Sequence, residues 1–253
     1  MTRQFLGLDV GGSSIKGGLV DLDAGRVVGD LISAPTPQPA TPAAMLPVFA
    51  DLAARLQGPR GPVGIAFPSV IKQGRVCTAA NIDHGWIGVD GPAYVAPTLQ
   101  RPVVFLNDAD AAGVAEVKWG AGRGMNGTVI MLTFGTGIGT ALFVDGKLFP
   151  NSELGHMEVR GMEAEKWTSA HVRTAQKLDW PAWIERVNVY LAQMYDLFWP
   201  DLFILGGAVS ERFNEFAPLL RSQAQIRPAH FAGQAGAIGA ALAAAGDRSL
   251  SDS

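Results

Sequence analysis

Short apolar runs separated by glycine-containing turns open the chain. The runs are Phe5–Val10, Ile15–Leu22 and Val27–Ile32, with Gly11-Gly12 and Ala24-Gly25 between them. Apolar runs of this length, bounded by glycine, are typical of β-strands joined by tight turns. The opening of the chain therefore predicts a three-strand meander.

A proline-rich stretch then separates the meander from a predicted helix. Pro35–Pro42 contains four prolines and no hydrophobic periodicity, which predicts a loop. Thr41 and Pro42 supply a helix N-cap and a first-turn proline. The apolar residues on one face of this helix are Leu46, Phe49, Leu52 and Leu56. Pro47 lies inside the pattern, so we expect it to kink the helix or to delay its start.

The remaining hydrophobic patterns predict further strands and helices. Buried strands are predicted at Pro62–Phe67, Val103–Leu106 and Leu202–Leu205, and helices at Ala109–Val117 and Gly236–Ala245, the second closed by Gly246. Between residues 184 and 198, apolar side chains recur at helical spacing. We interpret this stripe as core, with no cofactor role.

The opening pattern of strand, glycine turn and strand occurs a second time. After the glycine-rich passage Gly120–Gly127 come a strand at Val129–Thr133, a turn at Gly135–Gly139, a strand at Thr140–Val144 and a hairpin turn at Asp145-Gly146. In the two copies, Asp9-Val10-Gly11 aligns with Thr133-Phe134-Gly135, and Leu19-Val20-Asp21 aligns with Phe143-Val144-Asp145. This correspondence favours a duplicated domain over a chance match.

Composition limits the class of protein. The 253 residues suffice for one large domain or two smaller ones, and 48% hydrophobic against 17% charged residues excludes a disordered chain. A net charge of -3 argues against nucleic acid as the main partner. Cys77 is the only cysteine of the sequence, which excludes an internal disulfide and a multi-thiolate metal site. Without an apolar run of ~20 residues or a signal-peptide pattern, we expect no membrane association and a cytoplasmic location.

The sequence DVGGSSIK, which begins at Asp9, is the first motif with clear chemical potential. A predicted strand leads Asp9 into a turn in which Gly11 and Gly12 allow an anion to approach backbone N–H groups. Ser13 adds a hydroxyl group and Lys16 a positive charge. The motif favours a phosphate-binding turn, with an ordinary tight hairpin as the alternative.

The second copy carries the sequence TFGTGIGT from Thr133. Its G-x-G-x-G run is superficially like a dinucleotide fingerprint, but that motif requires a following helix, and here a strand is predicted. Gly146-Lys147, followed by Leu148, does not complete a Walker loop. We therefore expect two glycine turns, at matching points of a duplication, to hold one phosphate chain between two domains.

Two further segments carry titratable groups. Asn107-Asp108 follows a predicted strand and precedes a helix, so it either caps the helix or lets Asp108 take a proton from a substrate hydroxyl. Glu153, His156 and Glu165 form either a solvated loop or a hydrogen-bonding set for a polyhydroxylated sugar. Metal ligation by His156 is not expected, because no cysteine or second histidine lies near it in the sequence.

Several segments together make the chain resemble a known family. They are LDVGGSSIKG (8–17), NIDHGWIG (81–88), NDADAAG (107–113), LTFGTGIGTALFVDG (132–146), ELGHMEV (153–159), EAEKWTSAHVR (163–173), FILGGAVS (203–210) and AGAIGAALAA (235–244). In this order they resemble the ROK (repressor, open reading frame, kinase) sugar kinases, and most of all the short bacterial polyphosphate glucokinases. The resemblance implies a duplicated α/β fold of the actin-like ATPase (ribonuclease H-like) type, with two domains around a cleft. We expect residues 1–112 and 233–253 to form the smaller N-terminal domain, and residues 113–232 the larger C-terminal domain.

The same resemblance implies roles for individual residues. Asp108 is expected to be the general base on the sugar 6-hydroxyl. Residues expected to bind the sugar are Pro68, Ser69, Asn81, Asn107, Glu153, His156 and Glu165. Residues expected to bind the donor phosphates are Asp9, Gly11, Gly12, Ser13, Lys16, Thr136, Gly137, Gly206 and Gly207, with Mg²⁺ near Asp9. Many family members carry a cysteine-rich zinc knuckle after the ELGH-type motif, and since this chain lacks it we expect no zinc.

The implied activity is phosphoryl transfer to the 6-hydroxyl of glucose by a homodimer, with inorganic polyphosphate as the expected donor and ATP as a further candidate donor. An ATP-dependent glucokinase or a glucomannokinase is the alternative within the family, and a non-catalytic sugar-binding module is the alternative outside it. A repressor is not expected, because the first strand begins near Phe5 and leaves no room for a helix-turn-helix. The cations expected to line a polyphosphate groove are Lys16, Lys118, Arg123 and Lys166.

Overall fold

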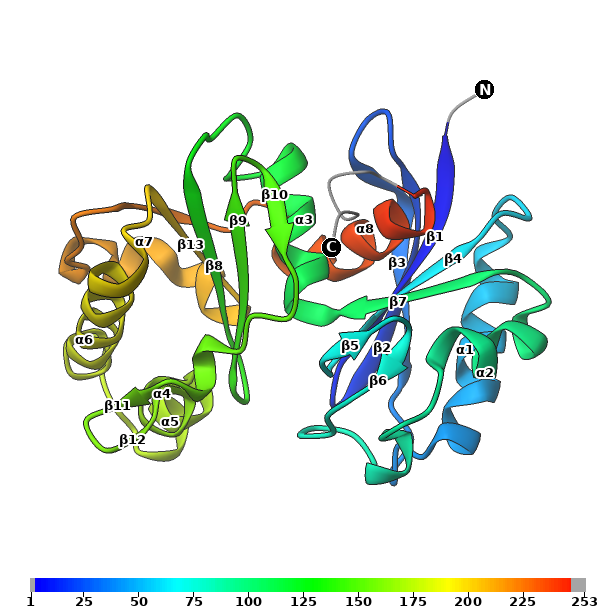
Figure 1. Ribbon diagram of the computed structural model, residues 1–253, viewed down its shortest axis with the longest axis horizontal. Helices are drawn as coiled ribbons and strands as arrows, with labels where there is room; N and C mark the ends of the chain where they lie inside the picture. The colour runs from blue at the N-terminus through cyan, green and yellow to red at the C-terminus, as the bar shows by residue number, and fades with distance from the viewer. Residues whose placement is uncertain (1–2, 247–253) are drawn as a thin grey trace. The chain divides into compact units, whose positions relative to one another are not determined.

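The computed structural model describes residues 3–246, which form two compact α/β units (Figure 1). Unit 1 contains the residues up to Ala115 and those from Gln234 onward, and unit 2 contains Glu116–Gly233. The domain boundaries expected from the sequence, after residues 112 and 232, stay a prediction.

The sheet of unit 1 begins with the predicted meander. Its strands are β1 (Gln4–Val10), β2 (Ser14–Asp21), β3 (Arg26–Pro35), β4 (Val63–Phe67) and β7 (Val103–Asn107), in the order β3-β2-β1-β4-β7. β2 pairs antiparallel with β1 and β3, whereas β4 pairs parallel with β1 and β7. The parallel pairs bring the carboxyl ends of β1, β4 and β7 to one edge of the sheet.

Helix α1 (Pro42–Leu56) begins where the sequence predicts. The Thr41 hydroxyl accepts a hydrogen bond from the Ala44 N–H at 3.2 Å, which caps the first turn. The expectation that Pro47 delays the start is wrong, because this cap and Pro42 at the first helical position already define the beginning. The residues that α1 buries are Met45, Phe49 and Leu52, whereas Leu46 and Leu56 are half-buried.

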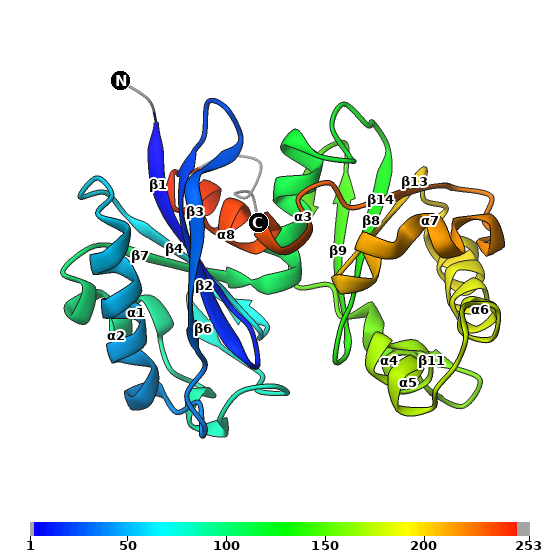
Figure 2. The ribbon, with the colours of Figure 1, turned by 180° about the vertical axis from the view of Figure 1, so that it is seen from behind.

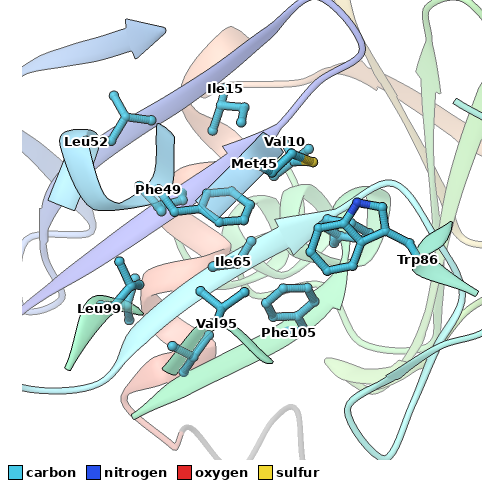
Figure 3. Close-up of a cluster of buried hydrophobic side chains, with 14 of the residues drawn as sticks. Val10, Ile15, Met45, Phe49, Leu52, Ile65, Trp86, Val95, Leu99 and Phe105 are labelled. Atoms are coloured by element: carbon cyan, nitrogen blue, oxygen red, sulfur yellow. The ribbon is translucent and has the colours of Figure 1, made fainter. Parts of the chain in front are cut away.

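A second helix, α2 (Gly91–Leu99), was not predicted from the sequence. Its two prolines, Pro92 and Pro97, hide the helical pattern, but Pro92 lies in the first turn, where no N–H is needed. The Asp90 carboxylate caps this turn by accepting from the Ala93 N–H at 3.0 Å. Residues of α1 and α2 pack with β1, β4 and β7 in the main hydrophobic core of unit 1 (Figure 3).

Helix α8 (Ala235–Ala244) covers the opposite face of the sheet from α1 and α2 (Figure 1 and Figure 2). A Cβ on Gly7 would lie 1.8 Å from the carbonyl oxygen of Ala237, and one on Gly64 would lie 1.7 Å from that of Ala240. The glycines in β1 and β4 therefore allow the helix backbone to lie directly on the sheet. Successive residues of β1 point to opposite faces of the sheet. Leu6, Leu8 and Val10 therefore enter the hydrophobic core, whereas Gly7 lies against α8.

Unit 2 contains a second five-stranded sheet within the described residues. Its strands are β8 (Thr128–Phe134), β9 (Ile138–Val144), β10 (Lys147–Phe149), β13 (Leu202–Gly206) and β14 (Gln225–Pro228), in the order β10-β9-β8-β13-β14. Helix α6 (Trp180–Phe198) packs Ile184, Val187 and Leu191 against this sheet, so the helical stripe is core, as predicted.

The two sheets confirm the predicted duplication. In each, an antiparallel meander is followed by two strands that extend the sheet in parallel. The detailed alignment of the second strands is wrong by one residue, because Leu19 faces Leu6 in unit 1 whereas the residue that faces Ile130 in unit 2 is Leu142. The turn from Phe134 to Ile138 is one residue shorter than the turn from Val10 to Ile15, and β9 accordingly begins inside the predicted turn.

The remaining elements complete the described chain. They are the strands β5 (Ile71–Lys72), β6 (Arg75–Val76), β11 (Glu158–Val159) and β12 (Met162–Glu163), the helices α3 (Asp108–Trp119), α4 (Ala164–Thr168), α5 (Ala170–Ala175) and α7 (Phe213–Phe216), and the 3-10 turns η1 (His84–Trp86), η2 (Leu154–His156), η3 (Ala208–Arg212), η4 (Ala217–Leu219) and η5 (Ala232–Gln234). None of the helices within residues 3–246 has the length and apolar character needed to cross a membrane.

Candidate active site

The carboxyl ends of β1, β4 and β7 carry the part of the candidate site that belongs to unit 1. Asp9 lies opposite Ala66 in the β1–β4 pair, and the next residue of β4, Phe67, lies opposite Asn107 in the β4–β7 pair. The Asp9 turn, the turn after Phe67 and the Asn107-Asp108 pair therefore meet at one sheet edge. Ligands of parallel α/β sheets bind at this kind of edge.

The β1–β2 turn is anchored on one side and open on the other. Asp9 and Lys16 are cross-strand partners, and both backbone polar groups of Gly11 are hydrogen-bonded within the unit, at 3.0 and 2.6 Å. Gly12 and Ser13 are exposed, and no atom lies within 4 Å of the place where a Cβ on Gly12 would be. The predicted donor residues of unit 1 thus form a fixed turn with an accessible tip.

The Asp9 carboxylate lies against the first turn of α8. A Cβ on Gly236 would be 2.5 Å from the Asp9 Cγ, so glycine is required there for the carboxylate to keep its place. Burial raises the pKa of Asp9 to about 6, although the charge of Lys16 opposes the rise. A half-buried carboxylate whose charge is only partly offset offers the hard oxygen ligand that Mg²⁺ prefers, so the residue fits the expected metal.

The β7–α3 junction confirms helix capping, one of the two outcomes considered for Asn107 and Asp108, whereas proton transfer to Asp108 stays a prediction. The Asn107 Oδ1 accepts from the Asp110 N–H at 3.0 Å, and its Nδ2 donates to the Ser69 carbonyl oxygen at 3.2 Å. Asn107 therefore caps α3 and ties it to the turn after β4. The Asp108 Oδ1 accepts from the Ala109 N–H at 2.8 Å, which fixes the carboxylate at the start of the helix.

The predicted sugar residues after β4 have unequal positions. The Ser69 hydroxyl is buried and donates to the Thr78 carbonyl oxygen at 2.8 Å, so its observed role is to close the turn. Pro68 is half-buried beside it, and Asn81 is exposed in the loop before η1. Contact of these residues with a sugar stays a prediction.

In unit 2, the two glycine turns lie at neighbouring strand ends. Gly206 faces Thr133 in the β13–β8 pair. Gly207 has φ +83°, and a Cβ there would lie 2.2 Å from the Phe134 carbonyl oxygen. The structure thus brings together, at one edge of the second sheet, the four predicted donor residues Thr136, Gly137, Gly206 and Gly207.

The loop after β10 presents Glu153 and His156. Thr140, buried in β9, holds this loop: its hydroxyl donates to the Ser152 carbonyl oxygen and accepts from the Leu154 N–H at 3.1 Å. The Glu153 Oε2 lies 3.7 Å from the His156 Nε2. Burial raises the pKa of Glu153, an effect that His156 opposes and the charge of Glu165 reinforces.

Glu165 connects this loop with the glycine turn of unit 2. Its Oε1 lies 3.9 Å from the His156 Nδ1, and its Oε2 accepts from the Ile138 N–H at 3.4 Å. A Cβ on Gly137 would lie 2.3 Å from the same Oε2. Below it, burial and the charge of Glu165 raise the pKa of Tyr190, so this buried phenol stays neutral. Predicted sugar and phosphate residues are therefore in direct contact in unit 2.

Two residues of this cluster make contacts that were not predicted from the sequence. Glu163 was given no role, yet its Oε2 lies 3.5 Å from the His156 Nδ1. Lys166 was expected to line a phosphate groove, but its Nζ lies 2.9 Å from that Glu163 oxygen. The three-residue spacing of Glu163 and Lys166 at the start of a helix was the available signal, since such pairs lie on one face.

The duplicated sheets, with glycine turns and titratable groups at their edges, define the actin-like ATPase fold. A solved structure with this fold, the inorganic polyphosphate/ATP-glucomannokinase from Arthrobacter sp. strain KM, is 44% identical, covers 96% of this chain and 98% of its own, and has a TM-score of 0.92. A ROK family glucokinase from Streptomyces griseus, solved with glucose and AMPPNP, is 25% identical, covers 97% of this chain and 100% of its own, and has a TM-score of 0.83.

Sequence comparison assigns the family. Residues 5–169 match the ROK family. A polyphosphate glucokinase of Mycobacterium tuberculosis is 45% identical over 246 residues, which are 97% of this chain and 92% of that protein. The chain belongs to the ROK family.

Proposed function

We propose that the protein is a glucokinase that transfers a phosphoryl group from inorganic polyphosphate to the 6-hydroxyl of glucose. The observation that carries the proposal is the 45% identity with a polyphosphate glucokinase over 97% of the chain. The carboxylate at the β7–α3 junction and the glycine turns of both units supply the groups that this reaction needs. Phosphoryl transfer depends mainly on positioning and on charge neutralisation, and these groups are suited to both.

Asp108 acts as the general base. It accepts the proton of the 6-hydroxyl while that oxygen bonds to the terminal phosphorus, and the bridging P–O bond breaks so that the shortened polyphosphate leaves with the electron pair. The Ala109 N–H, 2.8 Å from one carboxylate oxygen, orients the base. A base of this kind contributes about 10²–10⁴-fold to the rate.

Each unit contributes to binding. In unit 1, Lys16 and the backbone of Gly12 and Ser13 bind donor phosphate, and Asp9 holds the Mg²⁺, which supplies charge neutralisation when bound. In unit 2, the carboxylates and the imidazole of the β10–α4 segment bind the remaining sugar hydroxyls. Those residues are Glu153, His156 and Glu165.

Polyphosphate as the preferred donor requires cations beyond the turn itself. Lys166 is paired with Glu163, so we propose that the polyanion is attracted by Lys16 of unit 1 and by Lys118 and Arg123 of unit 2. A second candidate function, ATP-dependent phosphorylation of glucose and mannose, is favoured by the 44% identity with the Arthrobacter protein, whose name includes ATP and glucomannokinase.

A coupled sugar-6-phosphate assay, run with each donor and each sugar at low and high salt, tests the proposal. We expect turnover with polyphosphate and glucose, and a kcat/KM for polyphosphate that falls more steeply with salt than that for ATP, because attraction to a long polyanion is screened. A preference for ATP at both salt concentrations would favour the second candidate. Glucose binding without turnover of any donor would indicate that the protein is a non-catalytic sugar-binding module.

Three attributes of the proposed enzyme have their own measurements. We expect a magnesium requirement, tested by chelation and add-back, and a homodimer, tested by sedimentation. We also propose that the enzyme acts in the cytoplasm, which cell fractionation tests.

A further inference from the structure

We infer that Glu163, held by Lys166, is a positioning residue for glucose because it fixes the imidazole ring of His156. The inference rests on the proposed function only in that His156 binds a sugar hydroxyl. No role for Glu163 follows from the sequence motifs, and the role that we assign to it acts through its contact with the histidine.

One oxygen of Glu163 lies close to nitrogen atoms of two other side chains. Its Oε2 lies 2.9 Å from the Lys166 Nζ and 3.5 Å from the His156 Nδ1. The hydrogen bond from Lys166 keeps the pKa of Glu163 below its ordinary value, so the group is an acceptor at neutral pH. An acceptor at this position favours a proton on Nδ1, in the way that a carboxylate orients a metal-bound histidine.

The other ring nitrogen faces a different group. Nε2 lies 3.7 Å from Glu153, whereas Nδ1 faces Glu163 and, at 3.9 Å, Glu165. Three carboxylates and Lys166 are thus the charged groups around the ring. With the proton on Nδ1, the Nε2 lone pair is available to accept a hydrogen bond from a sugar hydroxyl. The positive charge of Lys166 offsets one of the three negative charges.

The local fold explains how Glu163 reaches the histidine. β11 and β12 form a hairpin in which Glu163 lies opposite Glu158, and the Ala164 N–H donates to the Met157 carbonyl oxygen at 2.9 Å. The hairpin therefore returns the chain to the residue that follows His156. Glu158 is an exposed carboxylate on the same hairpin, which makes Glu158→Gln a matched control for Glu163→Gln.

The experiment compares wild type, Glu163→Gln, Glu158→Gln and Lys166→Met in the full chain. Imidazole ¹⁵N chemical shifts of His156, assigned with His156→Gln, report which nitrogen holds the proton in the absence of substrate. Calorimetric titration with glucose gives the Kd without turnover. We expect the Nδ1–H tautomer in wild type, its loss in Glu163→Gln, and a glucose Kd raised about tenfold, the size expected for a lost oriented hydrogen bond.

The controls separate positioning from a merely structural role. Glu158→Gln should keep the tautomer and the glucose Kd, and Lys166→Met should weaken glucose binding by less than Glu163→Gln. The polyphosphate KM should stay the same in all of them. If Glu163→Gln does not fold, Glu163→Asp and Lys166→Met carry the same test, with an intermediate Kd expected for the shortened carboxylate.

Other outcomes overturn the inference. They are a glucose Kd within twofold of wild type in folded Glu163→Gln, an Nε2–H tautomer in wild type, or a stoichiometric metal bound by His156, Glu163 and Glu165, whose ligand atoms lie within 4.8 Å of one another. Failure of the proposed function has a different signature. A wild type that binds glucose and turns over no donor refutes the kinase, while the Kd comparison still decides the role of Glu163.

Discussion

The glycine turns of the two units occupy equivalent places in duplicated sheets, yet only the first places charged side chains on its own strands. Asp9 faces Lys16 across the β1–β2 pair, and the equivalent positions in unit 2 are Thr133 and Gly139. The charge beside the second turn comes from outside the sheet, since Glu165 of α4 contacts Gly137. Unit 1 therefore carries ionisable groups on the two strands that flank its glycine turn, whereas unit 2 receives the charge beside its turn from α4, outside the sheet.

This difference shows how one duplicated sheet topology supports two different binding roles. Duplication fixes where a turn and a strand end lie, but the side chains at those places decide the chemistry. Each unit also anchors its functional segment with one buried threonine. Thr36 donates to the Gly11 carbonyl oxygen at 2.6 Å, and Thr140 holds the loop of Glu153 and His156.

The largest expected effect is a loss of kcat on substitution in unit 1, whereas substitution in unit 2 should change the KM for glucose. Asp108→Asn in unit 1 should lower kcat by about 10²–10⁴-fold with an unchanged glucose Kd, because the amide keeps the shape but cannot take the proton. Glu165→Gln in unit 2 should mainly raise the glucose KM. Steady-state kinetics and calorimetry measure both. A purified Asp108→Asn variant that retained more than about a tenth of wild-type kcat would refute the base assignment.

The second prediction concerns the stability of unit 1 as a function of pH. Since folding raises the pKa of Asp9 from 3.8 to about 6, the folded state binds this proton more tightly than the unfolded state. Its contribution to stability is therefore fully present below the lower value, is lost as pH rises through the higher one, and stays lost above it. At about 1.4 kcal/mol per unit, Asp9→Asn should stabilise the metal-free protein by roughly 2–3 kcal/mol at pH 7.5 and by little at pH 4.

Denaturant unfolding at a series of pH values, at constant ionic strength, measures this effect. Asp30→Asn, at an exposed position of β3, is the matched control. Added Mg²⁺ should stabilise wild type and not Asp9→Asn. If the unfolding free energy of wild type and Asp9→Asn depended on pH in the same way, folding would not raise the pKa of Asp9.

The sequence predicts those parts of the site that depend on local pattern. The meander, the glycine turns and the strand ends at Asp9 and Asn107 follow from periodicity and turn residues, which act over a few neighbours. Helix α2 was missed because prolines obscure it. Contacts that depend on packing were not predictable, and the clearest case is Gly236, whose lack of a side chain makes room for Asp9 from more than two hundred residues away in sequence.

The cluster of titratable side chains in unit 2 likewise contains contacts that could not be predicted from the sequence. Spacing alone placed Glu153, His156 and Glu165 in one set, and their side chains do lie together. Which carboxylate faces which ring nitrogen depends on the β11–β12 hairpin, and two-residue strands carry almost no periodic signal. The contact of Lys166 with Glu163 was not predicted, for the same reason.

A third prediction tests the two anchoring threonines. Thr36→Val and Thr140→Val each remove a buried hydroxyl and leave backbone groups without a partner, at a cost of about 1–3 kcal/mol in unfolding free energy. Thr36→Val should raise the donor KM and leave the glucose KM, whereas Thr140→Val should do the reverse. Denaturant unfolding and two-substrate kinetics measure these effects. Identical kinetic changes in both variants would contradict the division of tasks between the units.

The smallest expected effect lies within the second turn. A methyl group on Gly137 meets the Glu165 Oε2 at 2.3 Å, but that oxygen is the end of a flexible side chain and can move aside, so Gly137→Ala should cost less than about 1 kcal/mol in stability. The displaced carboxylate should raise the glucose KM a few-fold. Gly135→Ala is the control, because its Cβ would meet no atom within 4 Å. If Gly135→Ala raised the glucose KM as much as Gly137→Ala, the effect would belong to the turn backbone, and Glu165 would not connect the second turn with the sugar.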